Sequence, residues 1–168
     1  MDVSNPSLTV NSMLNVRASS KNTQRRFYAK IISRSLFNMP TVVLPSKSDA
    51  PVAYELFEGD AASSLLVVFL NGLGLPQTGW KPTINLIQKS SLSPKPWILT
   101  YDRYGQGASP RDPRESLPDK EPGYSHTLDD VTDDLHELIQ TLSPNRSSRI
   151  VLVNNSIGAH VARRYADR

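Results

Sequence analysis

Three short, largely apolar runs constrain what this chain can fold into: Leu65–Leu70, Trp97–Tyr101 and Arg149–Val153. Each run is too short for a buried helix, and none shows the strict alternation of a strand with one solvated face. We therefore expect three strands, the first two of them buried on both faces. Strands buried in this way are typical of parallel sheets, whose two faces are covered by helices.

Segments with helical character separate or follow these runs. The sequence predicts a short helix around Thr83–Gln88, a longer one over Thr127–Leu142 and a last one over Ile157–Arg168. Thr41–Leu44 and Val52–Phe57 are predicted to pair as a hairpin before the first buried run. This alternation of buried strands and amphipathic helices predicts an α/β fold, with a mainly parallel sheet and helices on both of its faces.

The helix over Thr127–Leu142 has the clearest pattern. Its apolar side chains recur on one face, at Leu128, Val131, Leu135, Leu138, Ile139 and Leu142. Four aspartates occupy its first two turns, where the positive end of the helix dipole favours negative charge: Asp129, Asp130, Asp133 and Asp134. By contrast, the preceding segment Arg103–Ser125 contains four prolines and many charged residues, so it is predicted to be a long surface loop.

Charge separates the chain into two parts. Residues 1–50 carry seven basic side chains against two acidic ones, whereas the remainder is slightly acidic. We expect residues 1–40 to form a basic, serine-rich extension without stable structure, and residues 41–168 to form the domain. An acid-poor N-terminus with arginine and serine is also typical of mitochondrial transit peptides, so a mitochondrial location stays open beside a cytoplasmic one. Because the high pI comes from the extension, it indicates no nucleic-acid partner for the domain.

Several classes of site are excluded by residues that the chain lacks. It has no cysteine, which rules out disulfides, thiolate metal sites and a cysteine nucleophile. We expect neither a metal nor a cofactor. The longest uninterrupted apolar run, Leu65–Leu70, is far too short to span a bilayer. A dinucleotide-binding fingerprint fails because Gln77 stands where its third glycine belongs, and the string typical of a P-loop does not occur.

The strongest functional signal lies directly after the last apolar run. There the segment Asn154-Asn155-Ser156-Ile157-Gly158 places a serine between small residues, just before the last predicted helix. This context is typical of a nucleophile elbow with the pattern G-x-S-x-G, in which a sharp strand-to-helix turn exposes the nucleophile. The second glycine is kept and Asn154 replaces the first. The alternative interpretation is an ordinary serine at a helix N-terminus.

Two further segments follow the other apolar runs in a matching order. They are Asn71-Gly72-Leu73-Gly74 and the longer segment Asp102-Arg103-Tyr104-Gly105-Gln106-Gly107-Ala108-Ser109. Together with the elbow, and with His126-Thr127-Leu128-Asp129-Asp130 before it, they resemble the N-terminal portion of an α/β-hydrolase fold protein over roughly residues 41–168. The first segment resembles the family's oxyanion loop, with asparagine in place of histidine. The second resembles the family's Asp-x-Arg-x-G-x-G-x-S turn.

The resemblance implies a serine hydrolase in which Ser156 attacks an acyl carbonyl. The backbone N–H groups of Leu73 and Ile157 would form the oxyanion hole. Other residues near the site would be structural: Asn71, Gly72, Asp102, Arg103 and Gly158. The implied substrate is a small molecule with an ester, thioester, lactone or amide bond, because epoxide- and haloalkane-cleaving relatives carry an aspartate at the nucleophile position. The oligomeric state is left undetermined.

The chain departs from the family pattern after the elbow. In the family, the acid and the histidine of the triad lie downstream of the nucleophile. The only downstream candidates, Asp167 and His160, lie on the helix that begins at the elbow, so their side chains are expected to follow that helix. We therefore expect a form truncated after the fifth strand and the following helix, inactive alone and with its last strand at an uncovered edge. The alternative function is a non-catalytic scaffold, or pseudoenzyme, that binds a small molecule or a partner.

Overall fold

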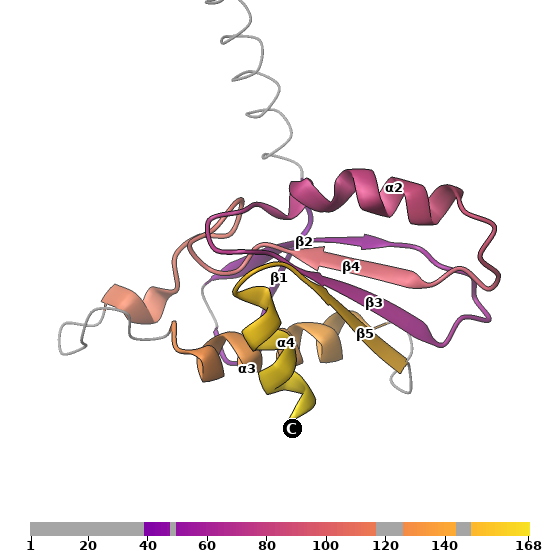
Figure 1. Cartoon of the computed structure of the whole chain (residues 1–168). Coiled ribbons are helices and arrows are strands. Elements are labelled where there is room, and N and C mark those ends of the chain that lie inside the picture. Colours follow the sequence, from indigo (N-terminus) through magenta and orange to yellow (C-terminus); the bar gives the residue numbers. More distant parts are fainter. Residues whose placement is uncertain (1–38, 48–49, 117–125, 144–148) are drawn as a thin grey trace, which may run out of the picture. The chain divides into compact units, whose positions relative to one another are not determined.

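The computed structural model describes residues 39–47, 50–116, 126–143 and 149–168. These residues belong to one unit, which runs from Met39 to Arg168. The predicted N-terminal extension, residues 1–40, falls outside the described residues except for its last two positions. The described part of the chain folds around a five-stranded sheet with the order β1-β2-β4-β3-β5 (Figure 1).

The sheet combines a parallel centre with an antiparallel hairpin. Its strands are β1 (Thr41–Val43), β2 (Pro51–Phe57), β3 (Leu65–Leu70), β4 (Trp97–Tyr101) and β5 (Arg149–Asn154). Strand β3 pairs in parallel with β4 on one side and with β5 on the other. The predicted hairpin of β1 and β2 joins this centre through the antiparallel pairing of β2 with β4. The predicted α/β fold with a mainly parallel sheet is confirmed.

The helices cover both faces of the sheet. Helix α2 (Lys81–Lys89) lies on one face, and α3 (Leu128–Leu142) and α4 (Gly158–Ala166) lie on the other (Figure 1). Two short 3-10 helices, η1 (Gln77–Trp80) and η2 (Pro113–Ser116), lie in the loops. Within the described residues, none of the helices combines the length and the apolar character that crossing a bilayer requires.

Strand β3 lies at the centre of the hydrophobic core because its alternate side chains pack on opposite faces of the sheet. Val68 belongs to a cluster with Leu135 of α3 and Val161 of α4. The next residue, Phe69, belongs to a second cluster with Ile84 of α2. All five side chains are buried. The prediction of a strand buried on both faces is therefore confirmed for β3.

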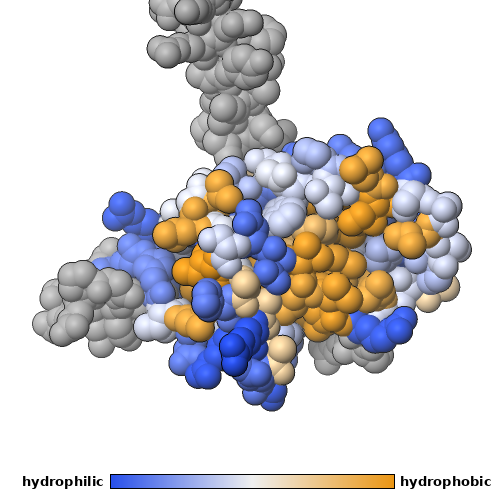
Figure 2. Space-filling model, in the orientation of Figure 1, coloured by the Kyte–Doolittle hydropathy of each residue, from blue (hydrophilic) through white to orange (hydrophobic). Residues whose placement is uncertain are grey.

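Strand β5 lies at an edge of the sheet. Within the described residues it pairs only with β3. Its side chains Ile150 and Val151 remain 38% and 46% exposed, which agrees with the expected uncovered edge. Figure 2 shows a broad apolar area on the part of the surface where β5 lies in Figure 1. Apolar edges of this kind can pair with further strands.

The prediction of a surface loop over Arg103–Ser125 is wrong for part of its length. Tyr104, Ser109 and Asp112 are buried. Long-range polar contacts hold the first two inward: the Tyr104 hydroxyl donates to the Ala50 carbonyl at 2.9 Å, and the Ser109 hydroxyl accepts from the Ala53 N–H at 2.9 Å. Residues 117–125 of the predicted loop lie outside the described residues.

Asp112 is buried because it pairs with a buried lysine. Lys47 Nζ lies 2.5 Å from Asp112 Oδ2 and 2.6 Å from Asp134 Oδ1, and it stands 4.3 Å from the centre of the Tyr104 ring. Arg114 Nη2 makes a further contact with Asp112 Oδ2 at 2.9 Å. In the sequence, Lys47 is one of the seven basic side chains of residues 1–50, and Asp134 is one of the aspartates near the start of the helix. The structure instead joins them in one buried ion cluster.

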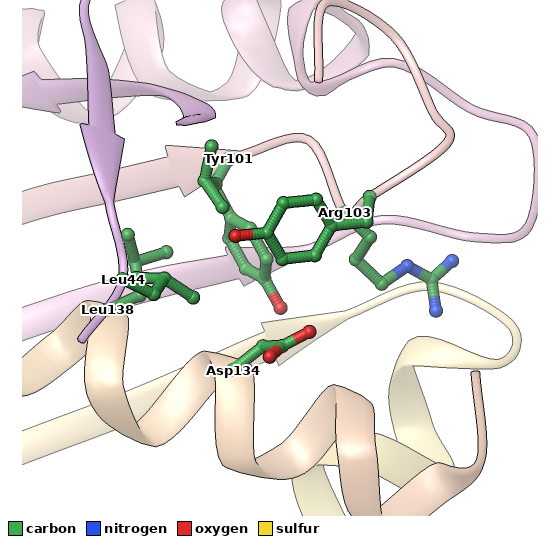
Figure 3. Close-up of a pocket in the computed structure, with 7 residues that line it drawn as sticks. Leu44, Tyr101, Arg103, Asp134 and Leu138 are labelled. Atoms are coloured by element: carbon green, nitrogen blue, oxygen red, sulfur yellow. The ribbon is translucent and has the colours of Figure 1, made fainter. Parts of the chain in front are cut away.

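The two carboxylates that share Lys47 differ in their pKa values. Burial raises the pKa of Asp134 to about 6, and the charge of Lys47 only partly opposes this effect. Figure 3 shows the Asp134 carboxylate pointing from α3 into a small pocket beneath Tyr101. Burial also acts on Asp112, but hydrogen bonds from Arg114 and Lys47 outweigh it and hold the pKa of Asp112 well below its usual range.

Replacement of Lys47 by methionine should destabilise the domain strongly. The substitution leaves two buried carboxylates without their shared cation, and breaking a buried ion pair in this way typically costs about 3–5 kcal/mol. The free energy of unfolding in urea measures the loss. Lys81→Met is the matched control, because the Lys81 side chain is 43% exposed in its pair with Glu55. The control should change the free energy of unfolding by less than about 1 kcal/mol.

Asp134 should make stability fall as the pH rises from about 4 to about 6. Its folded-state pKa of about 6 lies above the ordinary value of 3.8, so the folded protein holds a proton that the unfolded chain has already released. Protonated Asp134 stabilises the folded state below pH 4. This contribution to the free energy of unfolding decreases between pH 4 and pH 6, by at most about 3 kcal/mol. Urea titrations across the window should show a steeper decline for the wild type than for Asp134→Asn. Parallel curves for the two proteins would contradict the assignment.

Candidate active site

The turn between β5 and α4 holds Ser156 in an unusual backbone conformation. Its φ is +53°, and Ser156 is the only non-glycine residue with a positive φ among the described residues. The side chain is exposed. The turn is held on both sides, because the Asn155 N–H donates to the Leu70 carbonyl at 3.1 Å and the Ala159 N–H donates to the Ser156 carbonyl at 2.9 Å. The strain at Ser156 is of the kind that clusters at active sites.

Gly158 lets helix α4 begin close against the end of β3. A Cβ atom at this position would lie 2.8 Å from the Leu70 carbonyl oxygen and 3.1 Å from Leu70 Cβ. Since the closest of these atoms belongs to the backbone, a side chain could be accommodated only by moving the helix. Asn154, which replaces the other glycine of the elbow pattern, is exposed on the edge strand and pairs in register with Leu70.

The loop after β3 meets the elbow at Gly72. A Cβ atom on Gly72 would lie 3.5 Å from Ser156 Cβ and 3.1 Å from Leu75 Cδ1. The loop turns tightly there: the Leu75 N–H donates to the Gly72 carbonyl at 3.4 Å, and Gly74 has a φ of +71°. Leu73 lies at the tip of this turn and is 73% exposed. Within the described part of the chain, no hydrogen bond is formed by the N–H of Leu73 or by that of Ile157.

Asn71 anchors the start of this loop. It is buried, its Nδ2 donates to the Tyr101 carbonyl at 3.0 Å, and its Oδ1 accepts from Trp80 Nε1 at 2.5 Å. One side chain thereby joins the ends of β3 and β4 to η1. An asparagine can make both contacts because its amide donates and accepts at once.

Asp102 joins the loop after β3 to the turn after β4. Its buried carboxylate accepts the N–H of Gln77 at 2.7 Å and the N–H of Ala108 at 2.9 Å. Gly107 has a φ of +53°, and a Cβ atom there would lie 2.2 Å from the Asp102 carboxylate. Only a residue without a side chain therefore fits this turn. Within the described residues, the Asp102 carboxylate forms no hydrogen bond with Ser156.

Gln77 is a buried residue whose role the sequence analysis missed. Its Oε1 accepts from Thr100 Oγ1 at 2.7 Å, and its Nε2 donates to the Ala53 carbonyl at 3.3 Å. Together with the contact to Asp102, these bonds connect the loop after β3 to β2 and β4. A polar residue in a loop is expected to be solvated, and no local pattern marks Gln77 as an exception.

Arg103 reaches back to the loop after β3. Its Nη2 donates to the Gly72 carbonyl at 3.1 Å and to Gln106 Oε1 at 3.3 Å. Burial lowers the pKa of Arg103 from its usual value, and the nearby Tyr101 partly opposes this effect. The structure thus brings Arg103, Gly72 and Ser156 into one region, although they come from three different loops.

Two of the three described histidines make contacts away from Ser156. His126 pairs with Glu115, and His136 Nε2 lies 2.7 Å from Gln140 Nε2. His160 is exposed on α4, where it follows the helix as expected. Within the described residues, none of the imidazoles forms a hydrogen bond with Ser156 Oγ, and no group of acidic and histidine side chains is arranged to hold a metal ion.

Substitution of Gly158 by alanine should destabilise the domain and displace the start of α4. The added Cβ atom would press on the Leu70 backbone, and overpacking of this kind typically costs about 1–3 kcal/mol. Urea unfolding measures the effect. Gly79→Ala is the control, because a Cβ atom at Gly79 meets nothing within 4 Å. Equal losses in the two variants would mean that the elbow tolerates a side chain at Gly158.

Comparison with solved structures finds the fold of this chain in several hydrolases. A carboxylesterase structure from the thaumarchaeon Nitrososphaera gargenis is 24% identical with a TM-score of 0.58, and the match covers 76% of this chain and 40% of that one. The enol-lactonase from Burkholderia xenovorans is 23% identical with a TM-score of 0.55, covering 77% and 43%. An epoxide hydrolase structure from hot-environment metagenomes is 19% identical with a TM-score of 0.57, covering 77% and 37%.

These structures share the fold with this chain, and the chain spans about two fifths of the length of each. No curated protein sequence matches the chain. A family model described as the alpha/beta hydrolase family matches residues 67–168, which is more than half of the chain and includes the loop after β3, the turn after β4 and the elbow. The chain therefore belongs to the alpha/beta hydrolase family.

Proposed function

We propose that Ser156 is the nucleophile of a serine hydrolase. The observation that carries this proposal is the positive φ of an exposed serine between β5 and α4, beside the loop after β3. Such a turn holds the hydroxyl away from the chain, where a substrate carbonyl can approach it. A serine that only caps the N-terminus of a helix has no strained backbone, because N-cap residues adopt ordinary extended conformations.

The backbone groups around Ser156 support a role in acyl transfer. The N–H groups of Ile157 and Leu73 belong to the two loops that meet at Gly72, and within the described residues both are free of hydrogen bonds. We assign them to the oxyanion hole. Donors arranged in advance stabilise the negative charge that develops on the carbonyl oxygen, and losing one typically costs about 2.7–4 kcal/mol.

The proposed substrate is a small molecule with an ester, thioester, lactone or amide bond. A serine nucleophile forms an acyl intermediate with each of these groups. Carboxylesterase and enol-lactonase structures are among those similar to this chain. An epoxide hydrolase is also among them. The serine at position 156 favours acyl substrates over epoxides, which relatives of this family open with an aspartate.

A non-catalytic scaffold is the second candidate. One observation favours it: Ser156 Oγ forms no hydrogen bond to an imidazole within the described residues. A serine hydroxyl is a weak nucleophile unless an adjacent base takes its proton. A scaffold would keep the fold and the substrate-facing surface, and it would bind a small molecule or a partner without turnover.

Labelling with a fluorophosphonate probe distinguishes the two candidates. The protein is isolated from the cells that make it, labelled and digested with trypsin, which releases Ser156 in the peptide of residues 150–163, where it is the only serine. We expect the adduct on this peptide. We also expect Ser156→Ala to abolish the adduct and to lower ester hydrolysis by at least about a thousandfold.

Ser91→Ala is the matched control, because Ser91 is an exposed serine outside the site. It should leave both the adduct and the hydrolysis rate unchanged. An unlabelled peptide 150–163 in the natural protein would overturn the hydrolase proposal in favour of the scaffold.

A further inference from the structure

The carbonyl of Gly72 accepts two hydrogen bonds of unequal quality. The bond from Arg103 Nη2 is 3.1 Å long, and the bond from the Leu75 N–H is 3.4 Å long. The second lies beyond the usual range for a strong N–H to carbonyl bond. The first comes from a charged donor, and charge-assisted bonds are the stronger kind. Arg103 is therefore the main group that holds the orientation of this carbonyl.

The orientation of the Gly72 carbonyl also determines the direction of the Leu73 N–H. Both groups belong to the same planar peptide unit, and in a trans peptide they point in opposite directions. A donor that holds the carbonyl on one side therefore directs the N–H to the other side. Within the described residues the Leu73 N–H has no acceptor of its own to orient it.

We propose that Arg103 is a positioning residue that aims the Leu73 N–H into the oxyanion hole. This inference rests on the proposed function of Ser156, and it adds a role beyond support of the turn after β4. Arg103 acts through the Gly72–Leu73 peptide and makes no contact with the reacting atoms. Gly72 is buried, but Leu73 and Leu75 are 73% and 48% exposed, so packing on the Leu73 side of the peptide provides little to fix it.

The surroundings of Arg103 favour this role over that of a structural ion pair. None of the salt bridges among the described residues includes Arg103. Within the described residues, its hydrogen-bond partners are the Gly72 carbonyl and Gln106. The stem lines a small cavity with Tyr101 and Asp134, and Figure 3 shows the guanidinium at the end of this cavity away from Leu44.

The buried Nε of Arg103 has no hydrogen-bond partner within the described residues. Leaving a buried donor unpaired destabilises the folded state. The guanidinium nevertheless remains charged there, because arginine stays protonated in proteins. An arginine kept in this position at a cost to stability is consistent with a role in the site.

The test measures the direction of the Leu73 N–H and the reactivity of Ser156 in the same variants of the whole chain. Arg103→Met keeps an unbranched stem and removes the donors. We expect the residual dipolar coupling of the Leu73 N–H to change while those of β3 and β4 stay the same. We also expect fluorophosphonate labelling of Ser156 to slow by about ten- to a hundredfold. Arg103→Lys, which retains a charged donor, should recover part of both signals.

Arg111→Met is the matched control, since Arg111 is an exposed arginine in the same loop. Both readouts should equal those of the wild type. An unchanged Leu73 coupling in Arg103→Met overturns the proposal. A general loss of the strand couplings that Arg103→Lys fails to restore also overturns it, because the arginine would then serve folding alone. If wild-type Ser156 is not labelled, the proposed function fails, and the Leu73 coupling still decides whether Arg103 aims this N–H.

Discussion

The carboxylate of Asp102 is the contact on which the arrangement of the candidate site depends. It accepts backbone N–H groups from Gln77 and from Ala108, so one buried side chain joins the loop after β3 to the turn after β4. Leu73 and Leu75 in the first of these loops are exposed and contribute little packing. Buried hydrogen bonds give them a single conformation instead, because an unmade bond in a low-dielectric interior is costly. Gly107 allows the turn to close around the carboxylate.

The parallel centre of the sheet explains why residues distant in sequence meet at Ser156. Strands β3, β4 and β5 run in the same direction, so the loops that follow them emerge at the same edge of the sheet. Ligand sites of α/β proteins lie at the carboxyl ends of such strands. Here that edge brings together Gly72, Arg103 and Ser156. The buried ion cluster around Lys47 ties the segment after β1 to α3 and to Asp112 in the loop after β4. Its Asp134 lines the same small cavity as Arg103.

The hydrolase and the scaffold differ in one requirement, a general base within reach of Ser156 Oγ. The described residues supply the strained turn, the exposed hydroxyl and two N–H groups without hydrogen bonds. They supply no imidazole at the hydroxyl. In the proposed hydrolase, the described residues would supply the donors to the oxyanion, and proton transfer would require a group outside them. Such a division is possible because a triad is assembled from separate segments of the chain.

The sequence by itself determined the elements and the position of the elbow. Strands β3 and β4 begin and end where the apolar runs do, and α3 follows its apolar period, because burial against a sheet selects side chains at regular spacings. Gly158 marks the turn because a Cβ atom there would press on the Leu70 backbone. Only the tertiary structure decided the partners of Lys47, Gln77 and Arg103. Their long-range partners lie 23 to 87 positions away, and such contacts leave no periodic signal in the sequence. Folding buries these polar side chains, and a buried polar group must find its hydrogen-bond partner inside the protein. The fold therefore determines what each of the three residues binds.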